Sequence, residues 1–196
     1  MDKRDLEQLL SDVADGAVTP AAALTRIQTA PTADLGFAQL DLSRGVRQGA
    51  GEVVYGAGKT AEQIAAIIEA LRDAGQERIL VTRLDAEKAA RTAELLGNGI
   101  DLGYVPDAQL ALVGGKPSPT GNGRIVVACA GTSDLPVAKE AALTAEFYGN
   151  EVDRLYDVGV AGLHRLLAHA EELAQAQVVI AIAGMEGALA SVIGGL

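Results

Sequence analysis

Short apolar segments alternate with helical patterns from residue 124 onward, and this alternation constrains the fold more than any other feature of the chain. Strands are predicted at residues 125–130, 151–158 and 178–183, and helices at residues 136–148, 162–175 and 186–192. A succession of strand, helix and strand is typical of βαβ units, whose strands lie parallel and are joined by right-handed crossovers. We therefore predict an α/β fold built on a parallel sheet.

The same alternation of strands and helices is present, less regularly, between residues 51 and 123. Thr60 stands three residues before Gln63, which is capping-box spacing at the start of a helix. The segment 114–123 is rich in Gly and Pro and indicates a domain boundary. The elements predicted before it are strands at 52–55 and 78–82, helices at 60–74 and 85–96, and one or two short strands within 100–113.

Residues 1–50 are predicted to form an appendage. Their pattern indicates two short helices followed by an extended arm at residues 37–42. A segment of this size buries little apolar surface of its own, so we expect it to pack on something else. The predicted domains are thus the helical pair and arm at 1–50, a small α/β domain at 51–123, and the parallel-sheet domain at 124–196.

Charge and composition exclude two classes of partner. The 196 residues include 16 basic and 26 acidic side chains, which gives a net charge of −10, and no basic run is present. Such a chain repels a phosphate backbone, and aromatic residues at 3% are too few for a base-stacking platform, so nucleic acid is excluded. The most apolar stretch, residues 178–183, is far shorter than the roughly 20 residues of a membrane span.

The single cysteine indicates a cytoplasmic protein, because Cys129 has no intrachain partner for a disulfide. No signal peptide is visible, since the N-terminus leads into an acidic helical pattern. Cys129 falls within an apolar strand and is most simply a small buried hydrophobe. His164 and His169 are five residues apart on a predicted helix, so they do not share a face and are poor candidates for metal ligands.

The glycine turn at residues 56–60 resembles a phosphate loop only in part. The full motif needs a glycine where Val53 stands, inside the strand, so a nucleoside triphosphate site is not favoured. We expect a glycine turn that leads into a capped helix. A looser interpretation remains open, in which backbone N–H groups at the helix start bind an anion and Lys59 supplies positive charge.

A stronger candidate site follows the strand at residues 125–130. Gly131 permits a tight turn, Thr132 and Ser133 offer hydroxyl groups, and Asp134 can accept hydrogen bonds from ribose hydroxyls. In an open α/β sheet, ligands bind beyond the carboxyl ends of the strands, and a helix start favours an anionic group. The alternative is that Ser133 or Asp134 merely caps the helix, which accounts for one polar residue but not for three in succession.

Glu186 follows the strand at residues 178–183 in the same way. It is the one acid in a run that is otherwise apolar or glycine, and a carboxyl group beside a low-dielectric strand end suits general acid/base chemistry. An ordinary first-turn acid, favoured by the helix dipole, explains the spacing equally well. Arg44, Arg47 and Gln48 can form an anion clamp, although a solvated loop is the simpler interpretation.

These motifs together resemble two related families. Residues 125–136 and the βαβ pattern after them are similar to the phosphoribosylaminoimidazole carboxylase (PurE-like) family of purine synthesis. Three stretches resemble more closely the LarB family of carboxylase/hydrolases, which acts in nickel-pincer nucleotide synthesis. They are Asp41-x-x-Arg44-x-x-Arg47-Gln48-Gly49, the run from Glu52 to Thr60, and the run from Gly131 through Tyr148-Gly149 to Gly187. The resemblance implies a parallel three-layer Rossmann-like (PurE-like) sheet with a small N-terminal α/β appendage.

The resemblance also implies a reaction. LarB-type enzymes carboxylate C5 of the pyridinium ring of nicotinic acid adenine dinucleotide with CO2 or bicarbonate. They also hydrolyse its phosphoanhydride, giving AMP and pyridinium-3,5-biscarboxylic acid mononucleotide. A thiolate added at C4 makes C5 nucleophilic, and loss of the C5 proton and of the thiol restores aromaticity. No tightly bound cofactor is implied, and Mg²⁺ is the metal that the phosphoanhydride cleavage can use.

The roles that the resemblance implies fall on the motif residues. Ser133 and Asp134, after Gly131 and Thr132, hold CO2 or the ribose-phosphate part of the substrate. Glu186 is the acid/base or the water activator. Arg44, Arg47 and Lys59 bind phosphates, in a neighbouring subunit's site if the chain forms a homo-oligomer, since the related carboxylases are octamers.

The chain departs from the LarB pattern at its C-terminal end. It stops at Leu196, in the first turns of a helix, whereas LarB proteins continue and carry their nucleophilic cysteine in the later stretch. Cys129 is not the counterpart of that cysteine, because it lies in the wrong strand. We therefore expect 124–196 to be an incomplete carboxylase domain and the 196 residues to show weak or no carboxylation.

Two alternatives remain open at this point. One is an aminoimidazole ribonucleotide carboxylase of purine synthesis, which the N-terminal segment disfavours because that enzyme lacks it. The other is a non-catalytic nucleotide-binding module, which would bind the dinucleotide without turnover.

Overall fold

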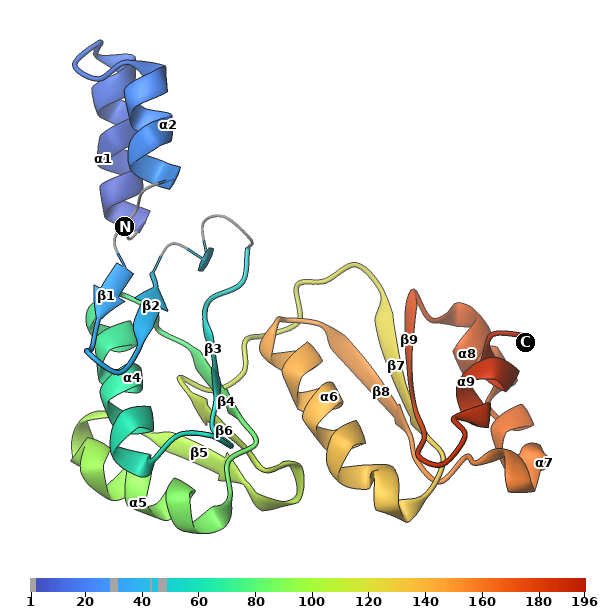
Figure 1. Cartoon of the computed structure of the whole chain (residues 1–196). Coiled ribbons are helices and arrows are strands. Elements are labelled where there is room, and N and C mark those ends of the chain that lie inside the picture. The colour runs from blue at the N-terminus through green and yellow to red at the C-terminus, as the bar shows by residue number, and fades with distance from the viewer. Residues whose placement is uncertain (1–2, 29–31, 43, 46–48) are drawn as a thin grey trace.

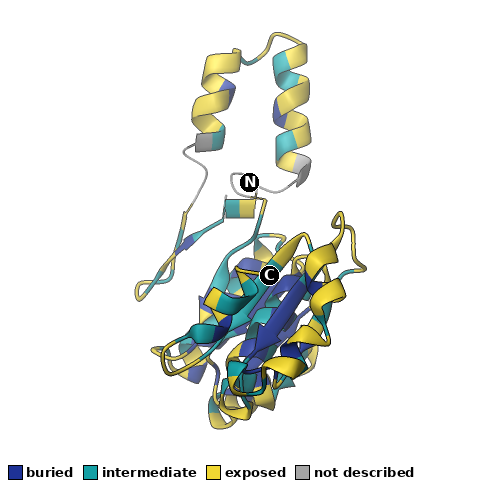
Figure 2. Ribbon diagram, turned by 90° about the vertical axis from the view of Figure 1, so that its right-hand side faces the viewer, coloured by how far each residue is buried: buried dark blue, intermediate teal, exposed yellow. Residues whose placement is uncertain are grey.

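The computed structural model describes residues 3–28, 32–42, 44–45 and 49–196 (Figure 1). The predicted helical pair is present as α1 (Lys3–Ala14) and α2 (Pro20–Gln28), which contact each other at one end of the molecule. Leu10 and Leu24 are more than half exposed, and Figure 2 shows both helices largely exposed. Packing of this pair on another surface therefore stays a prediction.

The predicted arm forms a small antiparallel hairpin of β1 (Thr32–Asp34) and β2 (Gln39–Asp41). The hairpin is attached to the body through Leu40, which is buried in the larger hydrophobic core. Glu52 reinforces this attachment, because its carboxylate accepts a hydrogen bond of 2.8 Å from the Asp41 backbone N–H.

A mixed four-stranded sheet follows, in the order β3-β4-β6-β5. Its strands are β3 (Val53–Tyr55), β4 (Ile79–Thr82), β5 (Leu102–Val105) and β6 (Leu110–Val113). The predicted parallel pairing holds for β3 and β4, but β6 lies antiparallel to both β4 and β5. The reason is the short connection from β5 to β6 through Pro106–Ala108, since such a connection can join only antiparallel strands.

One face of this mixed sheet is covered by α4 (Ala61–Asp73) and α5 (Ala86–Leu96). The capping box predicted from Thr60 and Gln63 is present at the start of α4, with hydrogen bonds in both directions. Large side chains fill the interface, and Ile64, Ile68 and Leu71 are completely buried. This unit therefore has a conventional, tightly filled aliphatic core.

The second sheet has three strands, in the order β8-β7-β9, and all of them are parallel. They are β7 (Arg124–Cys129), β8 (Glu151–Leu155) and β9 (Val178–Ile182). Helix α6 (Leu135–Phe147) lies on one face, and α7 (Leu163–Leu167), α8 (Ala170–Gln175) and α9 (Ala188–Ile193) lie on the other. The molecule is thus an α/β protein with one mixed and one parallel sheet.

Two predicted helices differ from the observed ones. The helix expected at residues 162–175 is divided into α7 and α8, because His169 leaves the helical region at φ −109° and ψ 19°. The helix expected from residue 186 begins only at Ala188, because Gly187 adopts a left-handed conformation at φ 69°. Glu186 therefore lies in a turn before the helix and not in its first turn.

Helix α6 packs against both sheets. Its alanines Ala138 and Ala142 face the parallel sheet, whereas Leu143 and Phe147 pack on the uncovered face of the mixed sheet. Such a helix is apolar around most of its circumference and is buried on two sides. An ion pair of 2.9 Å between Arg83 and Glu140 adds a polar link between the units. The boundary predicted at 114–123 falls in the segment that joins the two sheets, and the division into domains stays a prediction.

None of the helices in the described parts of the chain is both long and apolar enough to cross a membrane.

Candidate functional site

The carboxyl ends of β7, β8 and β9 meet at one edge of the parallel sheet, where they surround a cavity of about 550 Å³. We call this cavity the carboxyl-end pocket. It is the crevice that open α/β sheets offer to ligands. Its walls are the turns that follow the three strands, and its polar or projecting side chains are Ser133, Asp134, Asp157, Arg165, Met185 and Glu186.

Asp134 connects two of these turns. One carboxylate oxygen accepts a hydrogen bond of 3.0 Å from the Gly131 backbone N–H, and the other accepts one of 3.0 Å from Gly184, at the end of β9. The helix-cap interpretation of Asp134 therefore holds in part: its hydrogen bond with Gly131 closes a capping box at the 3-10 turn Thr132–Asp134, although its side chain makes no cap hydrogen bond to α6 itself. Both oxygens are occupied by backbone donors, which makes Asp134 a brace for the pocket.

Ser133 and Thr132 lie in the short turn between β7 and α6, and both are exposed. Ser133 lines the pocket together with Gly131, whereas Thr132 is outside its wall. The structure thus places Ser133 and Asp134 beside one cavity, just before α6.

Glu186 lines the same pocket but differs from the expectation in its surroundings. The turn that carries it is closed by a hydrogen bond of 3.0 Å from the Gly187 N–H to the Gly184 carbonyl, and it projects beyond the end of β9. Glu186 is therefore exposed, and the low-dielectric environment assumed for it is not present. Its carboxylate nevertheless lies in the wall of the pocket.

The structure adds a charged pair that sequence reasoning missed. Arg165, in α7, forms an ion pair of 2.7 Å with Asp157, which follows β8, and both line the pocket. The turn needs Gly159, because a side chain there would meet the Ala130 carbonyl oxygen at 2.7 Å. The signal was available in the sequence as an acid followed by closely spaced glycines at the end of a predicted strand.

Backbone strain is concentrated at the carboxyl edges of the sheets. Only glycine adopts a positive φ without strain, yet four other described residues do so. They are Arg83 at 53°, Gln109 at 48°, Asp157 at 58° and Met185 at 55°. Asp157 and Met185 line the pocket, and the Met185 side chain is fully exposed at its rim. Strain of this kind is characteristic of functional sites.

The glycine turn at residues 56–60 is a separate feature. The Lys59 ammonium donates a hydrogen bond of 3.0 Å to the Tyr55 carbonyl, and Lys88 donates one of 3.2 Å to the Ala57 carbonyl. Thr60 caps α4 as expected. The turn therefore leads into a capped helix, and Lys59 does not line the carboxyl-end pocket of its own chain.

The arginines of the arm are also remote from that pocket. Arg44 stands between Leu42 and Gly45, which line a different cavity at the opposite end of α6. The 13 residues of α6 separate the two cavities by roughly 20 Å, at 1.5 Å per residue. Arg47 and Gln48 lie outside the described residues.

Cys129 is buried at the end of β7, as expected for a small hydrophobe. Burial raises the pKa of its thiol, and the nearby Asp134 and Asp157 carboxylates act in the same direction. Both effects make Cys129 a poor nucleophile. Among the residues that the structure describes, no group of three His, Cys, Asp or Glu side chains is arranged to hold a metal ion.

The geometry described above defines an α/β protein with a pocket at the strand ends of its parallel sheet. Residues 32–114 match the LarB/PurE-like N-terminal domain. This match supports the LarB/PurE-like assignment that the motifs predict. The chain is also 35% identical, over 159 residues and 79% of its length, to an uncharacterized protein of Methanocaldococcus jannaschii. The matched region spans 62% of that relative, less than two thirds of its length.

Proposed function

We propose that the chain is the LarB-type part of a carboxylase/hydrolase that acts on nicotinic acid adenine dinucleotide. The products are AMP and pyridinium-3,5-biscarboxylic acid mononucleotide, with CO2 or bicarbonate as the second substrate. The observation that carries the proposal is the convergence of Ser133, Arg165 and Glu186 on one pocket braced by Asp134. The match of residues 32–114 supports the LarB/PurE-like assignment, and the resemblance, in which the purine carboxylase lacks the N-terminal segment, is the ground for preferring this reaction.

Binding of the substrate is assigned to two groups of the pocket. Arg165 presents a guanidinium that can hold a phosphate or carboxylate through two parallel hydrogen bonds. Ser133 offers its hydroxyl beside the start of α6, where the helix dipole favours an anion. Asp134 acts as a positioning residue, because it holds the turns of β7 and β9 together through Gly131 and Gly184.

Glu186 is assigned the proton transfer in the hydrolysis. Its carboxylate is exposed at the pocket wall, so it can take a proton from the water that attacks the phosphoanhydride. Mg²⁺ is usually bound by one or two carboxylates together with substrate phosphates. In this pocket Glu186 is the carboxylate that would hold it, because Asp157 is paired with Arg165. When bound, Mg²⁺ would offset negative charge on the phosphates.

The carboxylation requires a thiolate other than Cys129. That side chain is completely buried, so it cannot reach C4 of a pyridinium ring in the pocket. The proposal therefore places the covalent step on a cysteine outside these 196 residues, in keeping with the resemblance. Lys59 and the arm could reach a dinucleotide only in a second copy's pocket. A homo-oligomer, octameric by family resemblance, is accordingly part of the proposal, as is the three-layer PurE-like arrangement of the complete sheet.

The test measures AMP released from nicotinic acid adenine dinucleotide in the presence of bicarbonate, by chromatography. We expect release by the wild type, a loss of about 100-fold in E186Q, and no change in the control E172Q, an exposed glutamate of α8. Aminoimidazole ribonucleotide serves as the competing substrate. Its carboxylation without AMP release would establish the purine reaction, and saturable dinucleotide binding without turnover in any form of the protein would establish a binding module.

A further inference from the structure

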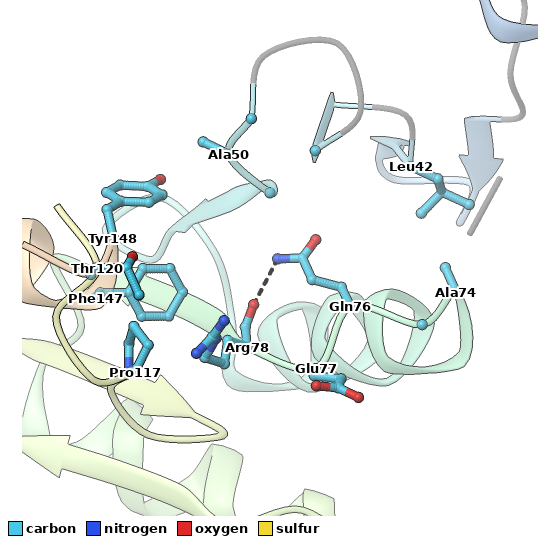
Figure 3. Close-up of a pocket in the computed structure, with 15 residues that line it drawn as sticks. Leu42, Ala50, Ala74, Gln76, Glu77, Arg78, Pro117, Thr120, Phe147 and Tyr148 are labelled. Atoms are coloured by element: carbon cyan, nitrogen blue, oxygen red, sulfur yellow. Dashed lines mark hydrogen bonds between the residues drawn. The ribbon is translucent and has the colours of Figure 1, made fainter. Parts of the chain in front are cut away.

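A second cavity, of about 650 Å³, lies at the other end of α6 (Figure 3). We call it the amino-end cavity, because residues just before β3 and β4 form one of its walls. The C-terminal end of α6 and the segment that joins the two sheets form the opposite wall. Its volume lies within the range of small-molecule sites. The proposed function makes no use of it.

An aromatic pair forms part of this cavity. Phe147 and Tyr148 pack edge to face, with ring centroids 5.3 Å apart and planes at 77°. Phe147 is only 8% exposed and is anchored in the core beneath the mixed sheet, whereas Tyr148 is 41% exposed. In a chain with two Phe, four Tyr and no Trp, this arrangement presents a fixed ring to an open cavity. Such a ring can stack on a planar ligand.

Arg78 supplies positive charge beside these rings. Figure 3 shows its side chain near Phe147 and Pro117, with Glu77 on the other side of the strand start. Most other basic side chains of this acidic protein form ion pairs, but Arg78 has no carboxylate partner in the described parts of the chain. An unpaired guanidinium in a cavity is a binding group for an anion.

The backbone that carries Arg78 is held in place by Gln76. The Gln76 amide donates hydrogen bonds of 3.0 Å to the Arg78 carbonyl and 3.1 Å to the Glu52 carbonyl, and its oxygen accepts one of 3.3 Å from the Glu52 N–H. These bonds fix the backbone from which the Arg78 side chain extends, while Tyr148 is the residue that caps the C-terminal end of α6. This preorganisation lowers the entropic cost of binding a ligand.

From this arrangement we propose that the amino-end cavity is a second binding site, for a mononucleotide-type ligand. The planar base stacks on Tyr148 and the phosphate is bound by Arg78. Arg44, one of the candidate anion-clamp residues of the sequence, stands between two lining residues of this same cavity. The proposal is independent of the reaction at the carboxyl-end pocket.

The experiment is a calorimetric titration of the full chain with AMP, and with adenosine and inorganic phosphate as partial probes. R78A and Y148L are each expected to weaken AMP binding by about tenfold or more. R91A is the charge-matched control from the exposed face of α5, and R165A removes the cation of the other pocket. We expect AMP binding at the amino-end cavity to be unchanged in R91A and in R165A. Adenosine and phosphate each bind at least about tenfold more weakly than AMP.

Three results would overturn the proposal. They are the absence of saturable AMP binding in the wild type, loss of binding in R165A alone, and binding of phosphate as tight as that of AMP. Circular dichroism melts of R78A and Y148L check that both variants fold. If either variant is unfolded, hydrogen exchange of the wild type is measured with and without AMP. The site predicts that AMP protects the backbone amides of Arg78 and Tyr148, and the absence of this protection would reject it.

Discussion

The two sheets of the molecule are stabilised in different ways. The mixed sheet packs on α4 and α5 through large aliphatic side chains, and both helices have side-chain N-caps, from Thr60 and Asp85. The parallel sheet packs on α6 through alanines, its other face is covered by three helices of five or six residues, and strand β9 is nowhere fully buried. We therefore expect the mixed sheet to contribute more to stability, while the carboxyl-end pocket lies on the sheet that is covered by shorter helices.

The largest expected effect tests where stability resides. Leu71 is completely buried between α4 and the mixed sheet, so L71A leaves a cavity and should lower the free energy of unfolding by about 2–5 kcal/mol. A142G, at the alanine interface of α6, should cost about 1 kcal/mol. Urea denaturation measures both values. Equal losses in the two variants would show that the sheets contribute alike.

The second prediction tests the brace in the pocket. D134A removes the acceptor of both the Gly131 and the Gly184 N–H groups, so the turns of β7 and β9 lose their alignment. We expect AMP release to fall by about 100-fold, the typical cost of a small displacement of reacting groups. The control is D101A, an exposed acid after α5, which should keep full activity. Full activity in D134A would show that Asp134 does not position the turns of β7 and β9 for the reaction.

A third prediction concerns the junction of the two sheets and its dependence on pH. Burial raises the pKa of Glu146, but hydrogen bonds and ion pairs with Lys116 and Arg154 outweigh it, so the pKa lies below its ordinary value of 4.5. A lowered pKa stabilises the folded state above pH 4.5, and this contribution is lost as the pH falls through the folded-state value. E146Q should therefore be less stable than the wild type by about 1 kcal/mol at pH 7. The difference should shrink in thermal melts at lower pH, and a constant difference would contradict the assignment.

The smallest expected effect separates strain from binding. M185G relieves a positive φ and should raise the free energy of unfolding by up to about 1 kcal/mol. It should also slow AMP release several-fold, because the apolar side chain at the pocket rim is lost. Q109G relieves similar strain away from the pocket and should change stability alone. Slower AMP release in Q109G, to the same extent, would show that Met185 has no special part in binding.

Much of the fold was predictable because local signals determined it. The capping box of Thr60 and Gln63 and the apolar run of β7 depend on residues close in sequence. The direction of β6 was not predictable, because the pattern at residues 100–113 did not distinguish one strand from a hairpin. The break between α7 and α8 at His169 follows from no pattern in the sequence.

The position of the candidate site could be predicted from the sequence, because parallel strands of one sheet bring their carboxyl ends to the same edge. Ser133, Asp134 and Glu186 could be placed together because each follows a strand of one sheet. Their environments could not be predicted, since the exposure of Glu186 depends on how its turn projects. The position of Arg44 beside another cavity depends on how the arm folds back on the body, which is a long-range property.

The proposed function requires the carboxyl-end pocket to bind the dinucleotide. A crystal structure of the protein soaked with nicotinic acid adenine dinucleotide tests it most directly. We expect density beyond the ends of β7, β8 and β9, with a phosphate or carboxylate within hydrogen-bonding distance of Arg165 and Ser133. Density for the dinucleotide elsewhere, with this pocket empty, would contradict it.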